Sequence, residues 1–468
     1  MNLPNATLII LVSVMLACFC GTGFAAVTPC EIEVVEKGSG WPVPLVELRT
    51  VNGAKFVTDN AGIVAFDLPE FMGKETWLYV KSPGYEVKKD AYGNAGVKLK
   101  MEPGGRRRIE VERTIVARRL GRLTGAGLFG ESQKLGKETD CQESGVVGCD
   151  SVQNTVYHGR LFWLWGDTEI ASYPLGIFDG TSATTELQPL SVFEPPLRVQ
   201  FNYFKDEDGA PRGIAKMPDA GPTWVSGYVG LPDATGKEHL VSIYAKVRNW
   251  LDIYEWGTAT WNDKTESFEQ GKVLWKQSAV TPNRPVLLDG HAVKWSDNRG
   301  KKWVLFCEPF PVARCPATYE AWLNTNTWEA LKSQKTLRAA GSNEKVTVHS
   351  GAIAWNPWRQ RWVTVFVQSN GKSSMLGEIW YAEADAPMGP WGPAVKILSH
   401  DNYTFYNPAI HPEFVAGKSP ILIFEGTYTA EFANRPQVTP KYNYNQILYR
   451  LDLDDPRLLP THQNSVKH

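Results

Sequence analysis

Two short apolar segments on either side of a turn, Ala352-Ile353-Ala354-Trp355 and Trp362-Val363-Thr364-Val365-Phe366, decide how this sequence is interpreted. The turn between them is Asn356-Pro357-Trp358-Arg359-Gln360. Short runs that are rich in β-branched and aromatic residues and are separated by turn-forming residues are typical of β-strands. A third run, Glu378-Ile379-Trp380-Tyr381-Ala382, follows. The stretch therefore predicts three successive antiparallel strands.

The same template recurs along the chain. The matching first and second segments are 152–156 with 161–165, 291–295 with 303–306 and 408–411 with 421–424, and a weaker copy has its second segment at 240–244. Further third segments are expected at 252–260, 318–323 and 446–450. The last three second segments begin about 60 residues apart, a spacing typical of propeller blades and much longer than a β-helix repeat. The sequence therefore predicts a five-bladed β-propeller over residues 123–460, with a long β-sandwich or a right-handed β-helix as the alternative.

The composition agrees with an all-β fold. The chain has 468 residues, enough for two or three domains, and 43% of them are hydrophobic, so it can bury a core. It contains 18 Trp, 17 Tyr and 19 Phe together with 41 Gly and 31 Pro, a mixture of strand-favouring and turn-forming residues. Lys and Arg (49) nearly balance Asp and Glu (50), so the charge gives no reason to expect a nucleic-acid partner.

Residues 1–25 are interpreted as a secretory signal peptide. An apolar run from Leu8 to Cys20 is followed by small residues up to Ala25, although no Lys or Arg precedes the run. Met15-Leu16-Ala17-Cys18 also resembles a lipoprotein box, so lipidation at Cys18 is an alternative. No later stretch approaches ~18 apolar residues, so no membrane span is expected. The predicted location is secreted or periplasmic.

The cysteine spacing agrees with export. After the first 25 residues the chain keeps Cys30, Cys141, Cys149, Cys307 and Cys315. Cys141/Cys149 and Cys307/Cys315 are each eight residues apart, a separation that suits disulfide-closed surface loops. Neither pair has the Cys-x-x-Cys spacing of a structural zinc site. Two disulfides are therefore expected, with four unpaired thiols as the alternative.

Residues 31–102 form a separate unit. Apolar runs at 42–48 and 63–68 flank the turn Thr58-Asp59-Asn60-Ala61-Gly62, and Trp77 to Val80 leads into Ser82-Pro83-Gly84-Tyr85. The pattern predicts a small β-sandwich. The order of these motifs resembles the carboxypeptidase regulatory-like, transthyretin-type domain, which implies a non-catalytic accessory module.

Residues 103–122 are expected to connect the two domains. The segment opens with Gly104-Gly105-Arg106-Arg107-Arg108, which is a poor strand, and further Arg residues continue to Arg122. Such a cation cluster could contact an acidic polymer or a membrane surface. Glu110 and Glu112 interrupt it, which favours a solvated connector.

The propeller prediction also predicts where ligands bind. The innermost strand of each blade lines a central channel, so the residues at or just before each first segment border its entrance. These residues are Asp150, Asp289, His291, His349, Ser350, Tyr406, Asn407 and His411, with an unassigned residue near Trp224 in the second repeat. Single histidines are more often core or loop residues, and a turn residue is the alternative reading of Asp150 and of Asp289.

Two stretches resemble a known group of enzymes. Residues 150–168, Asp-Ser-Val-Gln-Asn-Thr-Val-Tyr-His-Gly-Arg-Leu-Phe-Trp-Leu-Trp-Gly-Asp-Thr, are similar to the first blade of the five-bladed propeller glycoside hydrolases, such as the arabinanase/xylosidase group and the neoagarobiose hydrolases. Residues 377–391, which end in Gly-Pro-Trp, are similar to a phrase that closes a blade in that group. The resemblance implies an exported enzyme that hydrolyses glycosidic bonds of a polysaccharide or oligosaccharide, with Asp150 as the general base.

Glycoside hydrolysis requires two groups that flank the bond, one protonated and one ionised. In the arabinanase-like group the acid is a Glu, whereas the neoagarobiose hydrolases resemble this chain in having a His at the fourth blade. His349 and Glu308 are therefore both candidates for the acid. Asp289 fits a third carboxylate that tunes the pKa of the acid and orients the sugar.

Further residues are expected to contact the sugar, namely His291, Asp167, Trp165, Tyr406, Asn407 and Glu378. Trp165 could stack on a pyranose, although most aromatic side chains are expected in the core. His411 is the candidate ligand for a single structural ion in the channel, and no other cofactor is required. P-loop, dinucleotide, zinc-protease and lipase motifs are missing from the sequence. The alternative function is a propeller that binds carbohydrate or protein without turnover.

Overall fold

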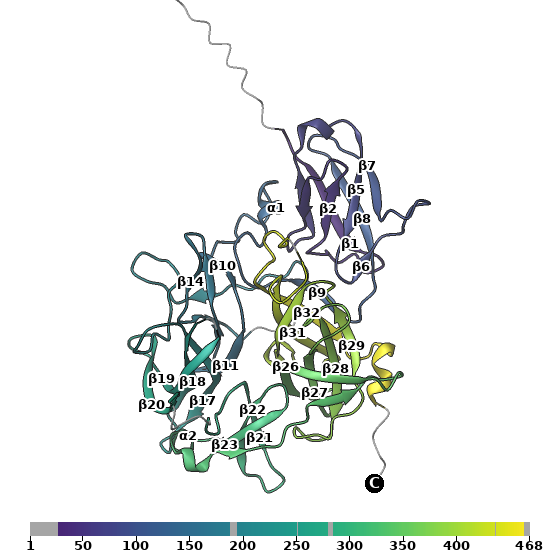
Figure 1. The fold of residues 1–468 in the computed structure, drawn as a ribbon. Helices are drawn as coiled ribbons and strands as arrows, with labels where there is room; N and C mark the ends of the chain where they lie inside the picture. The colour runs from purple at the N-terminus through teal and green to yellow at the C-terminus, as the bar shows by residue number, and fades with distance from the viewer. Residues whose placement is uncertain (1–26, 188–193, 250, 279–283, 436, 463–468) are drawn as a thin grey trace, which may run out of the picture.

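The computed structural model describes residues 27–187, 194–249, 251–278, 284–435 and 437–462 (Figure 1). The predicted signal peptide, with Cys18, lies outside the described residues. The described chain is nearly all β, as predicted, because its α-helices, α1 (Gly130–Gln133) and α2 (Tyr319–Leu323), are each a single short turn. Short 3-10 helices lie at Pro69–Phe71, Thr325–Thr327, Pro412–Phe414 and Pro456–His462. None of the helices in this part of the chain is long and apolar enough to cross a membrane.

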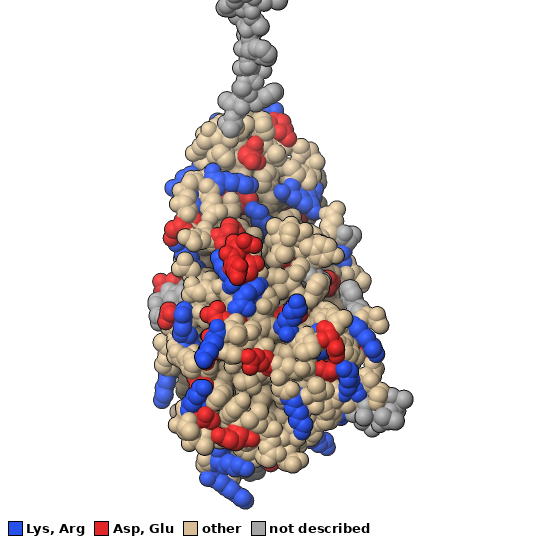
Figure 2. Space-filling model, turned by 90° about the vertical axis from the view of Figure 1, so that its left-hand side faces the viewer, with Lys and Arg blue, Asp and Glu red and all other residues tan. Residues whose placement is uncertain are grey.

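The N-terminal unit consists of two four-stranded sheets that share one core. The sheets are β4 (Ile63–Phe66), β1 (Cys30–Glu36), β8 (Arg106–Arg113) and β6 (Tyr85–Glu86), and β3 (Lys55–Val57), β2 (Glu47–Thr50), β5 (Glu75–Lys81) and β7 (Gly96–Lys100). Side chains alternate along β5, so that Leu78 and Val80 face the core while Trp77 and Tyr79 face outward. This unit forms the narrow upper part of the molecule in Figure 1 and Figure 2, where acidic and basic side chains are interspersed over the visible face.

Five antiparallel sheets follow in chain order. They are β11 (Gln153–Tyr157), β12 (Arg160–Trp165), β15 (Thr181–Thr185) and β16 (Asn202–Tyr203); β17 (Thr223–Pro232), β18 (Glu238–Arg248), β19 (Asp252–Asn262) and β20 (Ser267–Lys276); β21 (His291–Ser296), β22 (Lys302–Cys307), β23 (Pro311–Pro316) and β24 (Glu329–Ala330); β25 (Thr336–Arg338), β26 (Lys345–Asn356), β27 (Arg361–Gln368), β28 (Glu378–Ala384) and β29 (Val395–Ser399); and β30 (Thr404–Ile410), β31 (Ile421–Thr429), β32 (Asn445–Asp452) and β9 (Arg118–Arg122). A small sheet of β10 (Val146–Cys149), β13 (Thr168–Ile170) and β14 (Tyr173–Ile177) lies beside the first.

The first strands of these sheets are neighbours in space. β11 contacts β17, β17 contacts β21, β21 contacts β26, and β26 contacts β30. The circuit closes between β30 and β11, where the Asn154 side-chain amide lies 2.9 Å from His411 Nδ1. The arrangement is therefore β-propeller-like, with the first strands around a central channel.

The prediction of a solvated connector was wrong about the local structure of this segment. Gly104 and Gly105 do form a turn, but Arg106–Arg113 is strand β8, which pairs in parallel with β1. Arg118–Arg122 is strand β9, which pairs with β32 of the last sheet. The arginines are compatible with strands because Glu side chains neutralise them: Glu36, for example, lies 2.9 Å from Arg118 and 3.3 Å from Arg113.

Buried polar contacts join the N-terminal unit to the last sheet. The Arg119 guanidinium, which is 1% exposed, donates to the carbonyl oxygens of Pro44 and Pro83 at 3.0 and 2.9 Å. The Tyr442 hydroxyl donates to the Thr58 carbonyl at 2.7 Å, and the Asn60 amide exchanges two hydrogen bonds with the Arg122 backbone. The closing strand β9 is therefore held on both of its sides.

The third strand predicted at 318–323 is also wrong. Residues 319–323 form α2, and the third strand of that sheet is β23, which begins seven residues before the predicted segment. Thr318 caps α2, because its side-chain oxygen accepts a hydrogen bond from the Ala321 amide. The helix that begins after this cap replaces the strand that the sequence predicted here.

The two predicted disulfides are not formed, and all five described cysteines are free thiols. Cys315 lies opposite Val304 in the β22–β23 ladder, three positions from Cys307. At about 3.4 Å per residue, that offset is too long for a disulfide. Cys149 is buried in β10 with its thiol against Thr124, while Cys141 remains in the partly exposed loop before it.

Candidate active site

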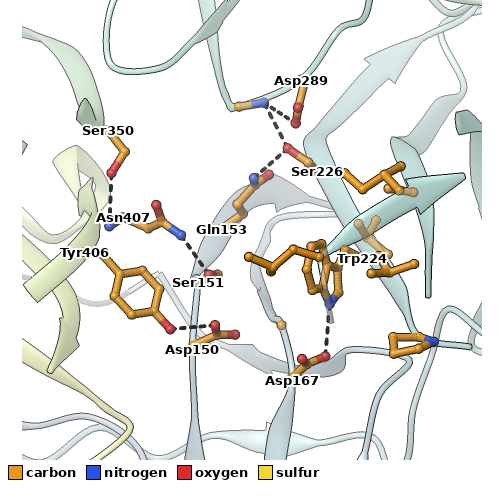
Figure 3. Close-up of a pocket in the computed structure, with 18 of the residues that line it drawn as sticks. Asp150, Ser151, Gln153, Asp167, Trp224, Ser226, Asp289, Ser350, Tyr406 and Asn407 are labelled. Carbon is orange, nitrogen blue, oxygen red and sulfur yellow. Dashed lines mark hydrogen bonds between the residues drawn. The ribbon is translucent and has the colours of Figure 1, made fainter. Parts of the chain in front are cut away.

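A cavity of about 700 Å³ opens at one end of the central channel. Its walls come from the ends of first and second strands and from the loops beside them (Figure 3). Four acidic side chains on these walls, Asp150, Asp167, Asp289 and Glu308, are called the four cavity carboxyls below. None of them forms an ion pair with another described residue, which is unusual for carboxyl groups that are partly withdrawn from water.

Strand register explains why the four cavity carboxyls lie in two pairs. Gln153 pairs with Leu164 across β11–β12, so Asp150 just before β11 and Asp167 just after β12 lie at the same end of the first sheet. His291 pairs with Cys307 across β21–β22, so Asp289 and Glu308 share the same end of the third sheet. Each pair therefore consists of the residue before a first strand and the residue after its antiparallel partner.

Asp150 is held by donors on one side and by a glycine on the other. The Tyr406 hydroxyl donates to Asp150 Oδ2 at 2.7 Å, and the Gly166 amide donates to the Asp150 carbonyl oxygen at 2.8 Å. A Cβ atom at Gly166 would collide with Asp150 Oδ1. Burial raises the pKa of Asp150 to about 6, against the hydrogen bonds from Tyr406, Tyr444 and Ser151 that favour the ionised form.

Asp167 adjoins Asp150 and is harder to ionise. The Trp224 indole Nε1 donates to Asp167 Oδ1 at 3.1 Å (Figure 3). Burial raises the pKa of Asp167 to about 7, and the negative charge of Asp150 adds to this effect. Near neutral pH, this corner therefore holds one carboxyl group that is mostly ionised and one that is about half protonated.

Asp289 and Glu308 form the second pair. Ser226 links Asp289 to the first sheet, because the Gln153 side-chain amide donates to Ser226 Oγ at 3.0 Å and the Gly290 amide donates to the same oxygen at 2.9 Å. Burial raises the pKa of Asp289, against hydrogen bonds from Ser226 and Gly290. Burial, and then the charge of Asp289, raise the pKa of Glu308 to about 7.

Other predicted residues join the cavity wall. The Asn407 side-chain amide donates to Ser151 Oγ at 2.8 Å, and the Asn407 backbone amide donates to Ser350 Oγ at 3.3 Å. His291 also lines the cavity, and burial followed by the charge of His411 lowers its pKa to about 4. Its imidazole is therefore neutral, and it can donate or accept one hydrogen bond to a ligand without adding charge.

Backbone geometry marks the same cavity. Five non-glycine residues on its wall have positive φ angles, namely Ser151 (53°), Asn249 (44°), Asn407 (48°), Phe432 (56°) and Tyr444 (56°). Non-glycine residues in this conformation carry a cost of order 1 kcal/mol each and cluster at functional sites. The concentration of strain around the cavity, together with the carboxyl groups, identifies it as the candidate active site.

Three predicted site residues lie elsewhere. Trp165 is 1% exposed in the core, stacked on Trp163, because its position in β12 faces the neighbouring sheet. Glu378 is buried in β28 and lies 3.2 Å from Lys396 Nζ, away from the cavity. His349 is exposed and hydrogen-bonds to Ser350, which takes the wall position itself.

His411 does not provide a free ligand for an ion. Its Nδ1 lies 2.9 Å from the Asn154 side-chain amide and its Nε2 lies 2.7 Å from Glu425 Oε1, and the ring and the carboxyl group are fully buried. Both nitrogens therefore have protein partners. The described part of the chain contains no cluster of three or more side chains of the metal-ligating types.

Sequence reasoning missed Ser226 and Tyr444 on the cavity wall. Ser226 precedes an irregularity in β17, where the register with β18 shifts between Ser226 and Val229, and β26 and β30 have shifts at similar places. Such bulges turn a side chain out of its normal alternation. Gly227 and Gly351, each inside a strand-like run, were the available signal.

Comparisons with known proteins complete the description. No family model and no curated protein matches the sequence. Among solved structures, an exo-1,5-alpha-L-arabinanase from a bovine ruminal metagenomic library has a TM-score of 0.38 and 10% identity, over 65% of this chain and 93% of that chain. An alpha-L-arabinanase from Cellvibrio cellulosa in complex with arabinohexaose has a TM-score of 0.38 and 11% identity, over 65% and 91%. An N-acetylgalactosamine deacetylase from F. plautii has a TM-score of 0.39 and 8% identity, over 69% and 94%.

Proposed function

We propose that this chain is an exported glycoside hydrolase, with a five-bladed propeller over residues 123–460 and a small accessory sandwich at residues 31–102. The five consecutive sheets, the contacts between their first strands and the cavity at one end of the channel support the propeller. The strands β8 and β9 extend the two units into the segment between them.

The observation that carries the proposed reaction is that two pairs of carboxyl groups share one cavity and differ in pKa. Asp150, with a pKa raised to about 6, is the general base, and Glu308, with a pKa raised to about 7, is the general acid. Between these values Asp150 is mostly ionised while Glu308 is mostly protonated, which is the combination that glycoside hydrolysis needs. Glu308 is preferred to His349 because it lines the cavity.

Asp289 and Tyr406 support these two roles. The charge of Asp289 keeps Glu308 protonated, and Glu308 gives its proton to the departing glycosidic oxygen. The Tyr406 hydroxyl orients the Asp150 carboxylate, which accepts a proton from water or attacks the anomeric carbon. Asn407, His291 and Asp167 line the same cavity and are proposed to hold the sugar hydroxyl groups.

The proposal is tested with Asp150→Asn and Glu308→Gln in the full chain. Release of reducing ends is measured over a panel of neutral and acidic polysaccharides. Each substitution should lower turnover by at least about 10²-fold, the scale of an acid–base contribution. Glu308→Gln should recover on aryl glycosides with good leaving groups, which depart without a proton, whereas Asp150→Asn should not recover. Glu329→Gln, on the outermost strand of the same sheet, is the matched control.

The pH profile gives a second readout. We expect kcat/KM to rise through about pH 6 and to fall through about pH 7, and Glu308→Gln should abolish the alkaline fall. Near-full activity of Asp150→Asn would show that the base lies elsewhere. If a glycan binds but none in the panel is cleaved, the chain is the non-catalytic binding propeller instead.

A further inference from the structure

The N-terminal unit has a second surface with the chemistry of a saccharide-binding site. It is the outer face of the sheet β3–β2–β5–β7, from which Trp77 and Tyr79 project because Leu78 and Val80 occupy the core. Both aromatic side chains are only partly buried, and their rings meet at 83° with centroids 6.0 Å apart. We refer to this surface as the β5 face.

Trp77 packs against the neighbouring strand. A Cβ atom at Gly96 of β7 would come within 2.6 Å of Trp77 Cζ2 and 2.8 Å of Trp77 Cε2, so the absence of a side chain there leaves room for the indole. The indole is therefore held against β7 while part of it stays exposed. A flat apolar ring that is fixed before binding loses little entropy when it stacks on the C–H face of a sugar.

Cations surround the aromatic pair. The Arg49 guanidinium lies 4.3 Å from the centre of the Tyr79 ring, and Lys98 lies directly across from Trp77 in the β5–β7 ladder. Lys81 projects from the same face of β5. Within the described residues, Arg49, Lys81 and Lys98 have no carboxylate partner, whereas Lys55 lies 3.6 Å from Glu47 on this face.

We propose that the β5 face binds an anionic polysaccharide, with Trp77 stacked on a sugar ring and Lys98, Arg49 and Lys81 facing its carboxylate or sulfate groups. Single-stranded nucleic acid also stacks on aromatic side chains, but it carries a charge on every nucleotide and selects a dense basic groove. Here Glu47 and Glu75 lie among the cations, and a single ring is flat, which favours a polymer with sparser charge.

One edge of the β5 face contacts a loop that also borders the cavity. Lys55 Nζ donates to Gln437 Oε1 at 3.3 Å, and a small groove between Lys81 and Arg435 lies beside this contact. Glu431 and Phe432, on the same loop as Arg435, line the cavity. A polymer bound on the β5 face would therefore be held near the cavity mouth, although binding at this face does not depend on turnover.

The test is native gel electrophoresis of the full chain in gels that contain polygalacturonate, with neutral galactan as the comparison polymer. We expect polygalacturonate to retard the protein, and the retardation to fall as ionic strength rises. Trp77→Ala and Lys98→Glu should each weaken binding by about tenfold or more. Tyr92→Ala is the matched control, because Tyr92 is the most exposed aromatic side chain of the same unit, at 92%, and lies outside the four strands of the β5 face.

Unchanged circular dichroism and thermal midpoints will show that the variants are folded. Equal retardation of Trp77→Ala and Tyr92→Ala would overturn the proposal, as would equal retardation by galactan. Tighter binding of single-stranded oligo-dT that Trp77→Ala abolishes would assign the surface to nucleic acid instead. Because these readouts do not involve catalysis, Asp150→Asn should be retarded like the unmodified chain even if the proposed hydrolase activity is wrong.

Discussion

Buried carboxyl groups inside the fold and those at the cavity have opposite surroundings. Inside the fold, Glu383 is fully buried, and its two oxygens lie 2.9 and 3.2 Å from the Nε atoms of Arg359 and Arg361. Glu425 is also fully buried, 2.7 Å from His411. The four cavity carboxyls have no such partner within the described chain, and burial raises the pKa of each of them.

The contrast distinguishes buried carboxyl groups that have an arginine or histidine partner from carboxyl groups that have none. A buried carboxylate costs several kcal/mol unless a cation and hydrogen bonds offset the loss of water. Inside the fold an arginine or a histidine supplies part of that offset, although burial still raises the pKa of Glu425 against the hydrogen bond from His411. At the cavity that offset is missing, so these groups lower the stability of the ionised protein, and a chemical role is a sufficient reason for them to be there.

The largest expected effect comes from unpairing an interior carboxyl. His411→Leu leaves Glu425 buried without its partner, so we expect the free energy of unfolding to fall by about 3 to 5 kcal/mol, measured by urea denaturation. His400→Leu is the matched control, because His400 is as buried but its Nε2 meets only the Tyr449 hydroxyl, at 3.0 Å. That variant should lose about 1 kcal/mol. Equal losses in the two variants would mean that ion pairing does not distinguish the interior.

Displacing a cavity carboxyl should instead change activity. Gly166→Ala places a methyl group against Asp150 Oδ1, while the backbone of Gly166 is one that alanine can adopt. We expect kcat/KM to fall by about 10²-fold, since small misplacements of a reacting group have effects of this size, with the unfolding free energy changed by less than about 1 kcal/mol. In the double variant with Asp150→Asn, Gly166→Ala should add almost nothing. A further independent loss would place its effect outside Asp150.

The smallest expected effect is on the pH dependence of stability. The folded-state pKa of Asp150 (about 6) and that of Glu308 (about 7) lie above the ordinary values of 3.8 and 4.5 for these side chains. The native state therefore binds more protons than the unfolded chain, so stability is greatest below about pH 4 to 5 for these groups and declines as the pH rises through 6 and 7. Asp150→Asn should reduce that decline by about 1 to 3 kcal/mol between pH 5 and pH 8.

Denaturation of Asp150→Asn at the two pH values checks this expectation. A parallel series on Glu329→Gln, whose carboxyl is exposed and paired with Arg314, should follow the unmodified protein. If Asp150→Asn showed the full decline in stability, the pKa of Asp150 would not be raised in the folded state.

The sequence predicted the fold better than the details of the site. The predicted second segments are strands in all five sheets and the predicted first segments are strands in four of them, because hairpins are local and their signal lies in consecutive residues; no first segment was assigned in the second sheet. Asp150 and Asp289 were found by the simple rule that residues before a first strand border the channel. Asp167 was predicted to contact the sugar although it follows a second strand, and antiparallel pairing returns the end of that strand to the same edge.

The remaining details of the site depend on backbone turns, bulges and strand register, which a short segment of sequence does not reveal. Tyr444 reaches Asp150 because its φ of 56° reverses the chain, and Ser226 faces the cavity because a bulge interrupts β17. Cys307 and Cys315 looked like a loop closure, but both became parts of regular strands, whose register keeps them apart. Spacing along the chain therefore predicted neither the bulges nor the register.

The closing strand β9 is synthesised long before β32, the strand with which it pairs. Gly121 pairs with Leu448, so the strand that completes the last sheet is made before the first of the five sheets. In a chain that is still being synthesised, β9 can therefore dock on the N-terminal unit through Arg119 before β32 has been made. Closing so long a loop is slow. We therefore expect the N-terminal unit to shield the unpaired edge of β9 from other chains until β32 pairs with it.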